Sequence, residues 1–156
     1  WAARPLRLVG MVADVSHRAT PDGASPVSFA DAYPMLALSR ASVDDLSARV
    51  GRAMHIDRFR PNLVVDGMAP YEEDTIAAAL IGAVPMRGTT LCSRCVATTI
   101  DPVTGEKGSE PLATLADYRR FDSAVYFGIN LVAEGEGQIA VGDEVRISAR
   151  HEERPL

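Results

Sequence analysis

The sequence predicts a mainly β fold, a barrel or a sandwich, with a few short helices. Three observations predict it: many short β-branched segments, few stretches with helical periodicity, and frequent turn residues between them. The 156 residues are 47% hydrophobic and 24% charged, which fits one globular domain with a real core. The net charge of −5 offers no global basic field for nucleic acid, and no apolar run approaches the roughly 20 residues of a membrane span. We therefore expect neither a nucleic-acid partner nor a membrane.

The first half of the chain contains two predicted strands and one predicted helix. Residues 6–9 form the first strand, and the polar residues 14–28 form a mobile loop. Ser42 is followed by an acid three residues later, as at a helix N-cap, and apolar residues then recur at helical spacing at Val43, Leu46, Val50 and Met54. Residues 63–65 are β-branched and lead into the turn dipeptide Asp66-Gly67, so a second strand is expected there.

The second half alternates short elements with turns. Residues 74–80 are expected to make one or two helical turns that end near Gly82, and residues 95–100 to form a strand followed by a turn at 101–105. Thr114 is expected to cap a short helix over residues 115–120. Two further strands are predicted at residues 126–132 and 139–147, joined by the glycine-rich residues 134–137.

The two cysteines, Cys92 and Cys95, form a CxxC pair with four competing interpretations. They can be buried packing residues, half of a zinc site, a redox dithiol, or the source of one thiolate for a metal held by a cofactor. Zinc is disfavoured because His17, His55 and His151 are scattered, and a thioredoxin-type dithiol because a strand is expected after Cys95. The fourth interpretation requires positive charge and anion-binding groups nearby, which adjacent arginines supply. Residue types alone leave the choice open.

Six ordered blocks of this sequence resemble the MOSC domain family (molybdenum cofactor sulfurase C-terminal domain). The resemblance runs from about Phe29 to Ile147 and is strongest toward the branch with the amidoxime-reducing component and the bacterial proteins that protect against hydroxylated base analogues. The blocks are Phe59–Val65, Pro70–Thr75, Cys92–Cys95 with Thr98–Gly105, Glu110–Leu115 with Tyr118-Arg119, Phe127–Asn130, and Val141–Val145.

The resemblance implies a closed, pyruvate-kinase-barrel-like β-barrel that holds a molybdopterin-type molybdenum cofactor. It implies that Cys95 is the metal ligand and the catalytic residue, with Cys92 as its companion. The residues expected to contact the cofactor are Arg60, Asn62, Ser93, Arg94, Thr98 and Asp31. Each has a plainer interpretation beside this one: surface ion pairs for the arginines, a strand cap for Asn62, a strand position for Thr98, and a turn for Asp31.

Two departures from the family pattern stand out. Amidoxime-reducing members carry a further cysteine where this chain has Met68. Full-length members also have an N-terminal β-rich segment that completes the cofactor pocket, whereas this chain starts at Trp1 without a signal or transit peptide. We therefore interpret residues 1–28 as a remnant of that segment, residues 29–150 as the MOSC domain and residues 151–156 as a tail.

The predicted function is a molybdenum-dependent reductase of N-hydroxylated small molecules that receives electrons from an external ferredoxin-like or flavin reductase. Two cysteines are too few for a disulfide framework, which fits the reducing cytoplasm. The alternatives are a sulfur carrier with a persulfide on Cys95, and a cofactor-binding domain that has no activity of its own.

Overall fold

The computed structural model describes residues 19–23, 25, 27, 30 and 32–156. The chain divides into two compact units, residues 1–34 and residues 35–156, and all named helices and strands belong to the second. In the first unit the described residues include a turn in which Thr20 N donates to Ser25 O at 2.8 Å. The predicted strand at residues 6–9, most of the predicted loop at 14–28, and Asp31 lie outside the described residues.

One seven-stranded sheet organises the second unit, which confirms the mainly β prediction. The strand order is β2-β1-β6-β4-β3-β7, and β5 pairs with β6. The β1–β2 pair is parallel and the other pairs are antiparallel. The strands are β1 (Met35–Ser39), β2 (Leu63–Val65), β3 (Ile76–Ile81), β4 (Val84–Ser93), β5 (Arg120–Phe121), β6 (Ala124–Ala133) and β7 (Val145–Arg150).

Register shifts in the β3–β7 and β4–β6 pairs bend the sheet. The sheet remains open, because β2 and β7 end the strand order and do not pair with each other among the described residues. A groove of about 1110 Å³ lies beside these two edge strands. The structure thus gives a curved, open sheet where the family resemblance implies a closed barrel.

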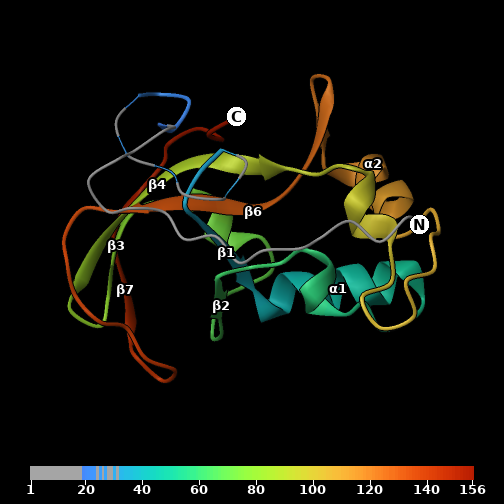
Figure 1. Cartoon of the computed structure of the whole chain (residues 1–156), viewed down its shortest axis with the longest axis horizontal. Helices are drawn as coiled ribbons and strands as arrows, with labels where there is room; N and C mark the ends of the chain where they lie inside the picture. Colours follow the sequence, from blue (N-terminus) through green and yellow to red (C-terminus); the bar gives the residue numbers. More distant parts are fainter. Residues whose placement is uncertain (1–18, 24, 26, 28–29, 31) are drawn as a thin grey trace, which may run out of the picture. The chain divides into compact units, whose positions relative to one another are not determined.

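The helices are few and short. They are α1 (Arg40–Val50), α2 (Leu112–Tyr118) and the 3-10 helices η1 (Ile56–Arg58), η2 (Glu72–Thr75) and η3 (Val96–Thr99). Figure 1 shows α1 and α2 together at one end of the sheet, with β3 and β7 at the other end. No helix among the described residues is long and apolar enough to cross a membrane.

Two clusters of buried apolar side chains hold the unit together. One lies on the strands and is built from β1, β3, β4 and β6, including Ile76, Met86 and Ile129. The other joins α1 and α2 to the sheet around Leu46 and Phe127. The second cluster also contains Phe59, whose ring lies 4.6 Å from that of Phe127, so it fixes the loop between η1 and β2 against β6.

The predicted helix after Ser42 exists, but it begins earlier. Ser39 is the N-cap, and its hydroxyl accepts a hydrogen bond from Ser42 N at 3.1 Å. Ser42 lies inside the first turn, where its hydroxyl donates to the buried carboxylate of Glu73 at 2.9 Å. The helix ends at Gly51, which has a left-handed φ of 77°, so Met54 is buried beyond the helix.

The predicted helical turns at residues 74–80 and the predicted strand at 95–100 are both wrong. The alanine-rich residues after η2 form β3, because pairing with β4 on one side and β7 on the other overrides helix propensity. Residues 96–99 form η3, because Thr98 and Thr99 donate their hydroxyls to the carbonyls three residues earlier. Glu73 and Asp74 lie in η2, and both are buried.

The remaining elements differ from the prediction mainly at their ends. The strands predicted at 63–65 and 126–132 are confirmed as β2 and β6. The helix predicted at 115–120 begins earlier, and its first turn is capped by Glu110, which accepts from Thr114 N at 3.1 Å. The strand predicted at 139–147 begins only at Val145, because Asp143 closes a turn with Ala140. Strands β1 and β4 were not predicted.

Candidate functional site around the cysteine pair

Cys95 lies where β4 has ended and η3 begins. Neither cysteine forms a disulfide, and Cys95 is exposed, whereas Cys92 on β4 is half-buried. Thr98 donates to the Cys95 carbonyl twice, from its backbone N at 3.2 Å and from its hydroxyl at 3.0 Å. These bonds fix the backbone of Cys95 and leave its sulfur accessible to a ligand.

Arg94 places a buried cation between the two cysteines. Its Nε donates to Phe127 O at 2.9 Å and its Nη1 to Phe59 O at 3.4 Å, while its buried Nη2 has no hydrogen-bond partner among the described residues. Burial is the main influence and lowers the pKa of this guanidinium, while the thiols of Cys92 and Cys95 act in the opposite direction. A buried cation held only by carbonyls is costly, so an anion close to the cysteines would stabilise this arrangement.

A second arginine, Arg58, connects the loop before β2 to the segment after Cys95. Its side chain is buried, forms an ion pair with Asp101, and donates from Nη1 to Thr98 O at 3.4 Å. Asp101 also accepts from the backbone N atoms of Val103 at 2.9 Å and Thr104 at 3.0 Å. The predicted Asx turn at Asp101 is therefore confirmed, and the ion pair is an added role that the sequence did not reveal.

These contacts bring three segments of the chain together. Arg94 joins the end of β4 to Phe59, and Arg58 joins the same loop to Thr98 and Asp101. The predicted cofactor-binding residues Arg60 and Asn62 lie on that loop, and Ser93 lies exposed at the end of β4. Arg94 and Thr98 thus lie at the cysteine pair, whereas no hydrogen bond or ion pair among the described residues joins Arg60 or Asn62 to it, and Asp31 lies outside the described part of the chain.

The loop residues have structural roles as well. Arg60 is exposed and has a left-handed φ of 53°. Asn62 bridges β1 and β2, because its Oδ1 accepts from Leu36 N at 2.8 Å and its backbone N donates to Leu36 O at 3.0 Å. The side-chain nitrogen Nδ2 of Asn62 takes no part in these two bonds and could donate to a ligand.

We expect Asp101→Asn to lower the melting temperature at neutral pH by a few degrees. The asparagine Oδ1 can keep the turn, but its amide cannot pair with buried Arg58. Hydrogen bonds from the backbone N–H groups of the turn are the main influence on the pKa of Asp101 and lower it. Arg58 lowers it further. A carboxylate whose pKa is lower in the folded state stabilises the fold at pH values above its unfolded-state pKa. This contribution is lost as the pH falls through its folded-state pKa.

Melting curves at several pH values test this expectation. The difference between Asp101→Asn and the wild type should shrink as the pH falls from 7 to below the usual pKa range of an aspartate. Asp66→Asn is the matched control, since its ion pair with Arg40 is exposed on both sides and should contribute little. Equal losses for the two variants would contradict the role assigned to the Arg58–Asp101 pair.

The donor set fits a metal that brings most of its own ligands. Among the described residues, no group of three or more His, Cys, Asp or Glu side chains is placed to hold a metal ion. Cys95 instead offers one exposed sulfur, and Arg94 offers one buried nitrogen that lacks an acceptor among the described residues. A cofactor that supplies its own metal ligands and carries anionic groups matches both features.

Comparisons with known proteins find relatives whose names refer to amidoxime reduction or to the molybdenum cofactor. The family model described as "MOSC domain" matches residues 24–146. Mitochondrial amidoxime-reducing component 1 of Mus musculus is 42% identical over 128 residues, which cover 76% of this chain and 38% of that protein. The molybdenum cofactor sulfurase of Oryza sativa subsp. japonica is 35% identical over 136 residues, covering 78% of this chain and 16% of that protein. The chain thus spans well under half the length of these relatives.

A solved structure shows a similar fold. YiiM from Geobacillus stearothermophilus matches with a TM-score of 0.55 and 15% sequence identity, over 74% of this chain and 54% of that chain. At this identity the likeness concerns the fold alone.

Proposed function

The chain belongs to the MOSC domain family, and from this premise we propose that it binds a molybdopterin-type molybdenum cofactor through the thiolate of Cys95. We further propose that the complete protein is a reductase of N-hydroxylated compounds. Relatives named as amidoxime-reducing components, at about 40% identity, support this substrate class. When bound, the cofactor supplies the two-electron chemistry that removes oxygen from nitrogen.

The unpartnered Nη2 of Arg94 is the observation that carries the proposal. A buried guanidinium that pairs with no carboxylate among the described residues is expected where an anion binds. The anion is the Cys95 thiolate together with the negatively charged part of the cofactor. Arg94 therefore orients the ligand and stabilises its charge, and Thr98 fixes the backbone that presents the sulfur.

We propose roles for the other candidate residues as well. We propose that Ser93, beside Arg94, presents its hydroxyl to the cofactor, and that Arg60 and Asn62 contact it from the loop before β2. Asp31 remains a proposed pocket acid. The open edges of β2 and β7 support the further proposal that additional chain in the complete protein closes the sheet into a barrel.

The partner and the compartment are proposals too. Reduction of an N-hydroxylated compound consumes two electrons and two protons and releases water, and we propose that an external ferredoxin-like or flavin reductase supplies the electrons. The two cysteines do not form a disulfide with each other, which supports a reducing compartment such as the cytoplasm. Relatives with "mitochondrial" in their names keep the mitochondrion as the alternative.

A sulfur carrier is the second candidate, because Cys95 is also exposed enough to hold a persulfide. A molybdenum cofactor sulfurase among the relatives favours this alternative. Metal analysis and cyanolysis of the full-length protein distinguish the two functions. Stoichiometric molybdenum supports the reductase, whereas metal-free protein that releases sulfane sulfur to cyanide supports the carrier.

We expect Arg94→Met to separate cofactor binding from stability. In the cofactor-free protein the substitution removes a costly buried charge while leaving two carbonyls without donors, so we expect the free energy of unfolding to change by only about 1 kcal/mol. Molybdenum content should fall at least about tenfold, because the buried cation that faces the ligand is gone.

Urea unfolding of the apoprotein and the molybdenum-to-protein ratio are the two measurements. Arg87→Met is the control, since Arg87 pairs with Glu134 in a partly exposed position on the middle of β4. A strongly destabilised Arg94→Met apoprotein that still takes up full molybdenum would show that Arg94 is only structural.

A further inference from the structure

The segment that carries Cys95 is short and is not held by the apolar core. Cys95 is the N-cap of η3, and the apolar side chains of Val96 and Ile100 are exposed. Thr98 and Thr99 are buried, but neither apolar cluster of the described residues includes them. A four-residue 3-10 helix makes too few hydrogen bonds to be stable by itself. Polar contacts from outside η3 must therefore hold it in place.

Arg58 supplies such a contact from η1. Its side chain is buried, and its guanidinium bridges two points of the segment: Nη1 donates to Thr98 O at 3.4 Å, and Nη2 pairs with the carboxylate of Asp101. Thr98 in turn donates to Cys95 O from its backbone N and from its hydroxyl. A continuous path of polar contacts therefore runs from Asp101 through Arg58 and Thr98 to the backbone of Cys95.

Both ends of the Arg58 bridge are themselves anchored. Phe59, the next residue along the chain, packs on Phe127 in the buried cluster of α1, α2 and the sheet. Asp101 is fixed by the turn that it closes with the backbone N atoms of Val103 and Thr104. Arg58 thus ties η3 to the buried cluster on one side and to the following turn on the other.

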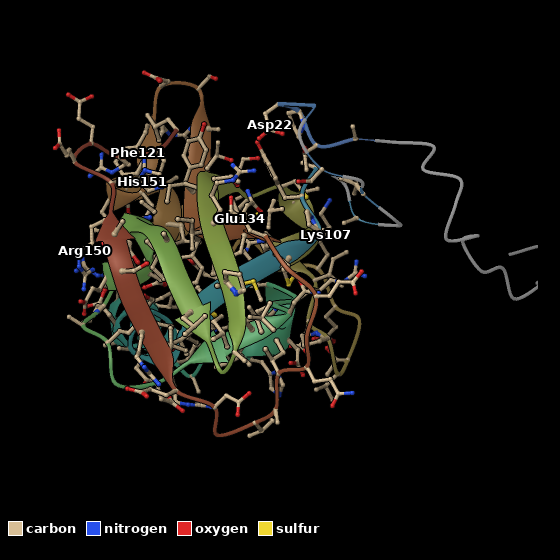
Figure 2. The ribbon with its side chains drawn as sticks, turned by 90° about the vertical axis from the view of Figure 1, so that its left-hand side faces the viewer. Asp22, Lys107, Phe121, Glu134, Arg150 and His151 are labelled. Atoms are coloured by element: carbon tan, nitrogen blue, oxygen red, sulfur yellow. The ribbon has the colours of Figure 1, made fainter. Side chains whose placement is uncertain are left out.

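A second buried arginine has the same kind of partners but a different place. Arg119 is 5% exposed, pairs with a carboxylate, and donates from Nε to Tyr126 O at 3.0 Å. Its carbonyl partner lies on β6 and not on η3. Figure 2 shows Phe121, whose ring contacts Arg119, and Lys107, in the loop after η3, on opposite sides of the view. Arg119 therefore represents a buried ion pair that supports the fold without touching the segment of Cys95.

We propose that Arg58 is a positioning residue for Cys95. By holding Thr98 O and Asp101 at the same time, it fixes η3 and with it the place from which the Cys95 sulfur meets its ligand. Arginine suits this task because its two terminal nitrogens form a rigid planar fork, whereas lysine has a single nitrogen on a flexible stem. The inference rests on the proposed role of Cys95 as a metal ligand and extends it to a residue that acts only through the backbone.

Arg58→Lys and Arg119→Lys in the full-length protein are the matched pair of variants. Each keeps a positive charge beside its carboxylate and gives up the contact with its carbonyl. Hydrogen–deuterium exchange of the cofactor-free proteins is followed at the amides of Thr98 and Ile100, which are hydrogen-bonded within the segment. We expect Arg58→Lys to speed both exchange rates at least about tenfold, and Arg119→Lys to leave them within about twofold of the wild type.

The rate at which molybdenum is lost during dialysis is the second measurement. Removing a group that orients a metal ligand typically costs about 10–100-fold in metal affinity, and such differences appear mainly in the dissociation rate. We expect Arg58→Lys to lose molybdenum about tenfold faster than the wild type, and Arg119→Lys to lose it at the wild-type rate. If Arg58→Lys does not fold, Asp101→Asn takes its place, because it releases the same guanidinium and should move both measurements in the same direction.

Three results would overturn the proposal. Equal exchange rates in the two lysine variants, or unprotected amides in the wild type, would show that Arg58 does not hold η3. Faster exchange in Arg58→Lys with unchanged loss of molybdenum would show that it holds η3 without positioning the ligand. A wild type that takes up no molybdenum would instead reject the proposed reductase function, and the exchange rates would still decide whether Arg58 fixes the segment of Cys95.

Discussion

Cys95→Ser in the full-length protein is expected to abolish molybdenum binding and the reduction of N-hydroxylated compounds together. A serine hydroxyl remains protonated at neutral pH and is a poor ligand for a soft metal centre, whereas a thiolate binds it directly. The substitution changes one atom at an exposed position, so the fold should be preserved. Molybdenum content should fall at least about a hundredfold, and the activity should fall in proportion.

Cys92→Ser is the matched control for this prediction, three residues away on the same segment. Its thiol is half-buried at the end of β4, and we propose no metal contact for it. This variant should keep most of its molybdenum and its activity. The reverse result, with molybdenum lost in Cys92→Ser and kept in Cys95→Ser, would mean that the ligand has been assigned to the wrong cysteine.

The sequence predicted the family better than it predicted the elements that carry the candidate site. The CxxC motif and its flanking blocks identified the family from residue identities, and the family model then matched residues 24–146. The expected strand after Cys95 is nevertheless a 3-10 helix, because hydroxyl-to-carbonyl bonds of Thr98 and Thr99 outweigh their β propensity. Motifs survive such errors because they depend on order and spacing more than on local conformation.

Features that depend on distant contacts could not be read from the sequence. Strand β3 has an alanine-rich sequence that suggests a helix, and only its two neighbouring strands make it a strand. The Arg58–Asp101 ion pair joins residues 43 positions apart, and the bond from Arg94 to Phe59 spans 35. No local pattern encodes these pairings, although an arginine next to a cysteine was a usable signal for the buried cation.

Closure of the sheet is the point where family resemblance and structure differ most. The resemblance implies a barrel, whereas β2 and β7 leave two edges open beside a large groove. Exposed strand edges offer unpaired backbone groups and are usually covered in stable proteins. The chain spans 38% of the murine relative's length, and the two open edges fit our proposal that further chain in the complete protein covers them.

Among substitutions that add one methyl group to the sheet, Gly88→Ala is expected to lower the stability most. Gly88 is buried on β4, where it pairs with Leu131 of β6. A Cβ at this position would lie 1.8 Å from Ile76 O and 3.2 Å from Ile129 Cδ1. The carbonyl belongs to the backbone of β3 beside a register shift, so it cannot move without disturbing the pairing of β3 with β7.

The cost of Gly88→Ala should therefore exceed the usual range for an added methyl group in a core and reach at least about 3 kcal/mol. Against a typical total of about 5–15 kcal/mol, much of the variant should unfold or aggregate, as soluble yield and urea unfolding would show. Gly108→Ala is the control, because the atom nearest to a Cβ added at Gly108 would be Thr99 O at 3.9 Å. The free energy of unfolding of this variant should stay within about 0.5 kcal/mol of the wild-type value. A Gly88→Ala protein as stable as Gly108→Ala would mean that β3 and β4 do not approach each other as closely as the structure shows. The same result would remove the reason for a glycine in the strand that leads to Cys95.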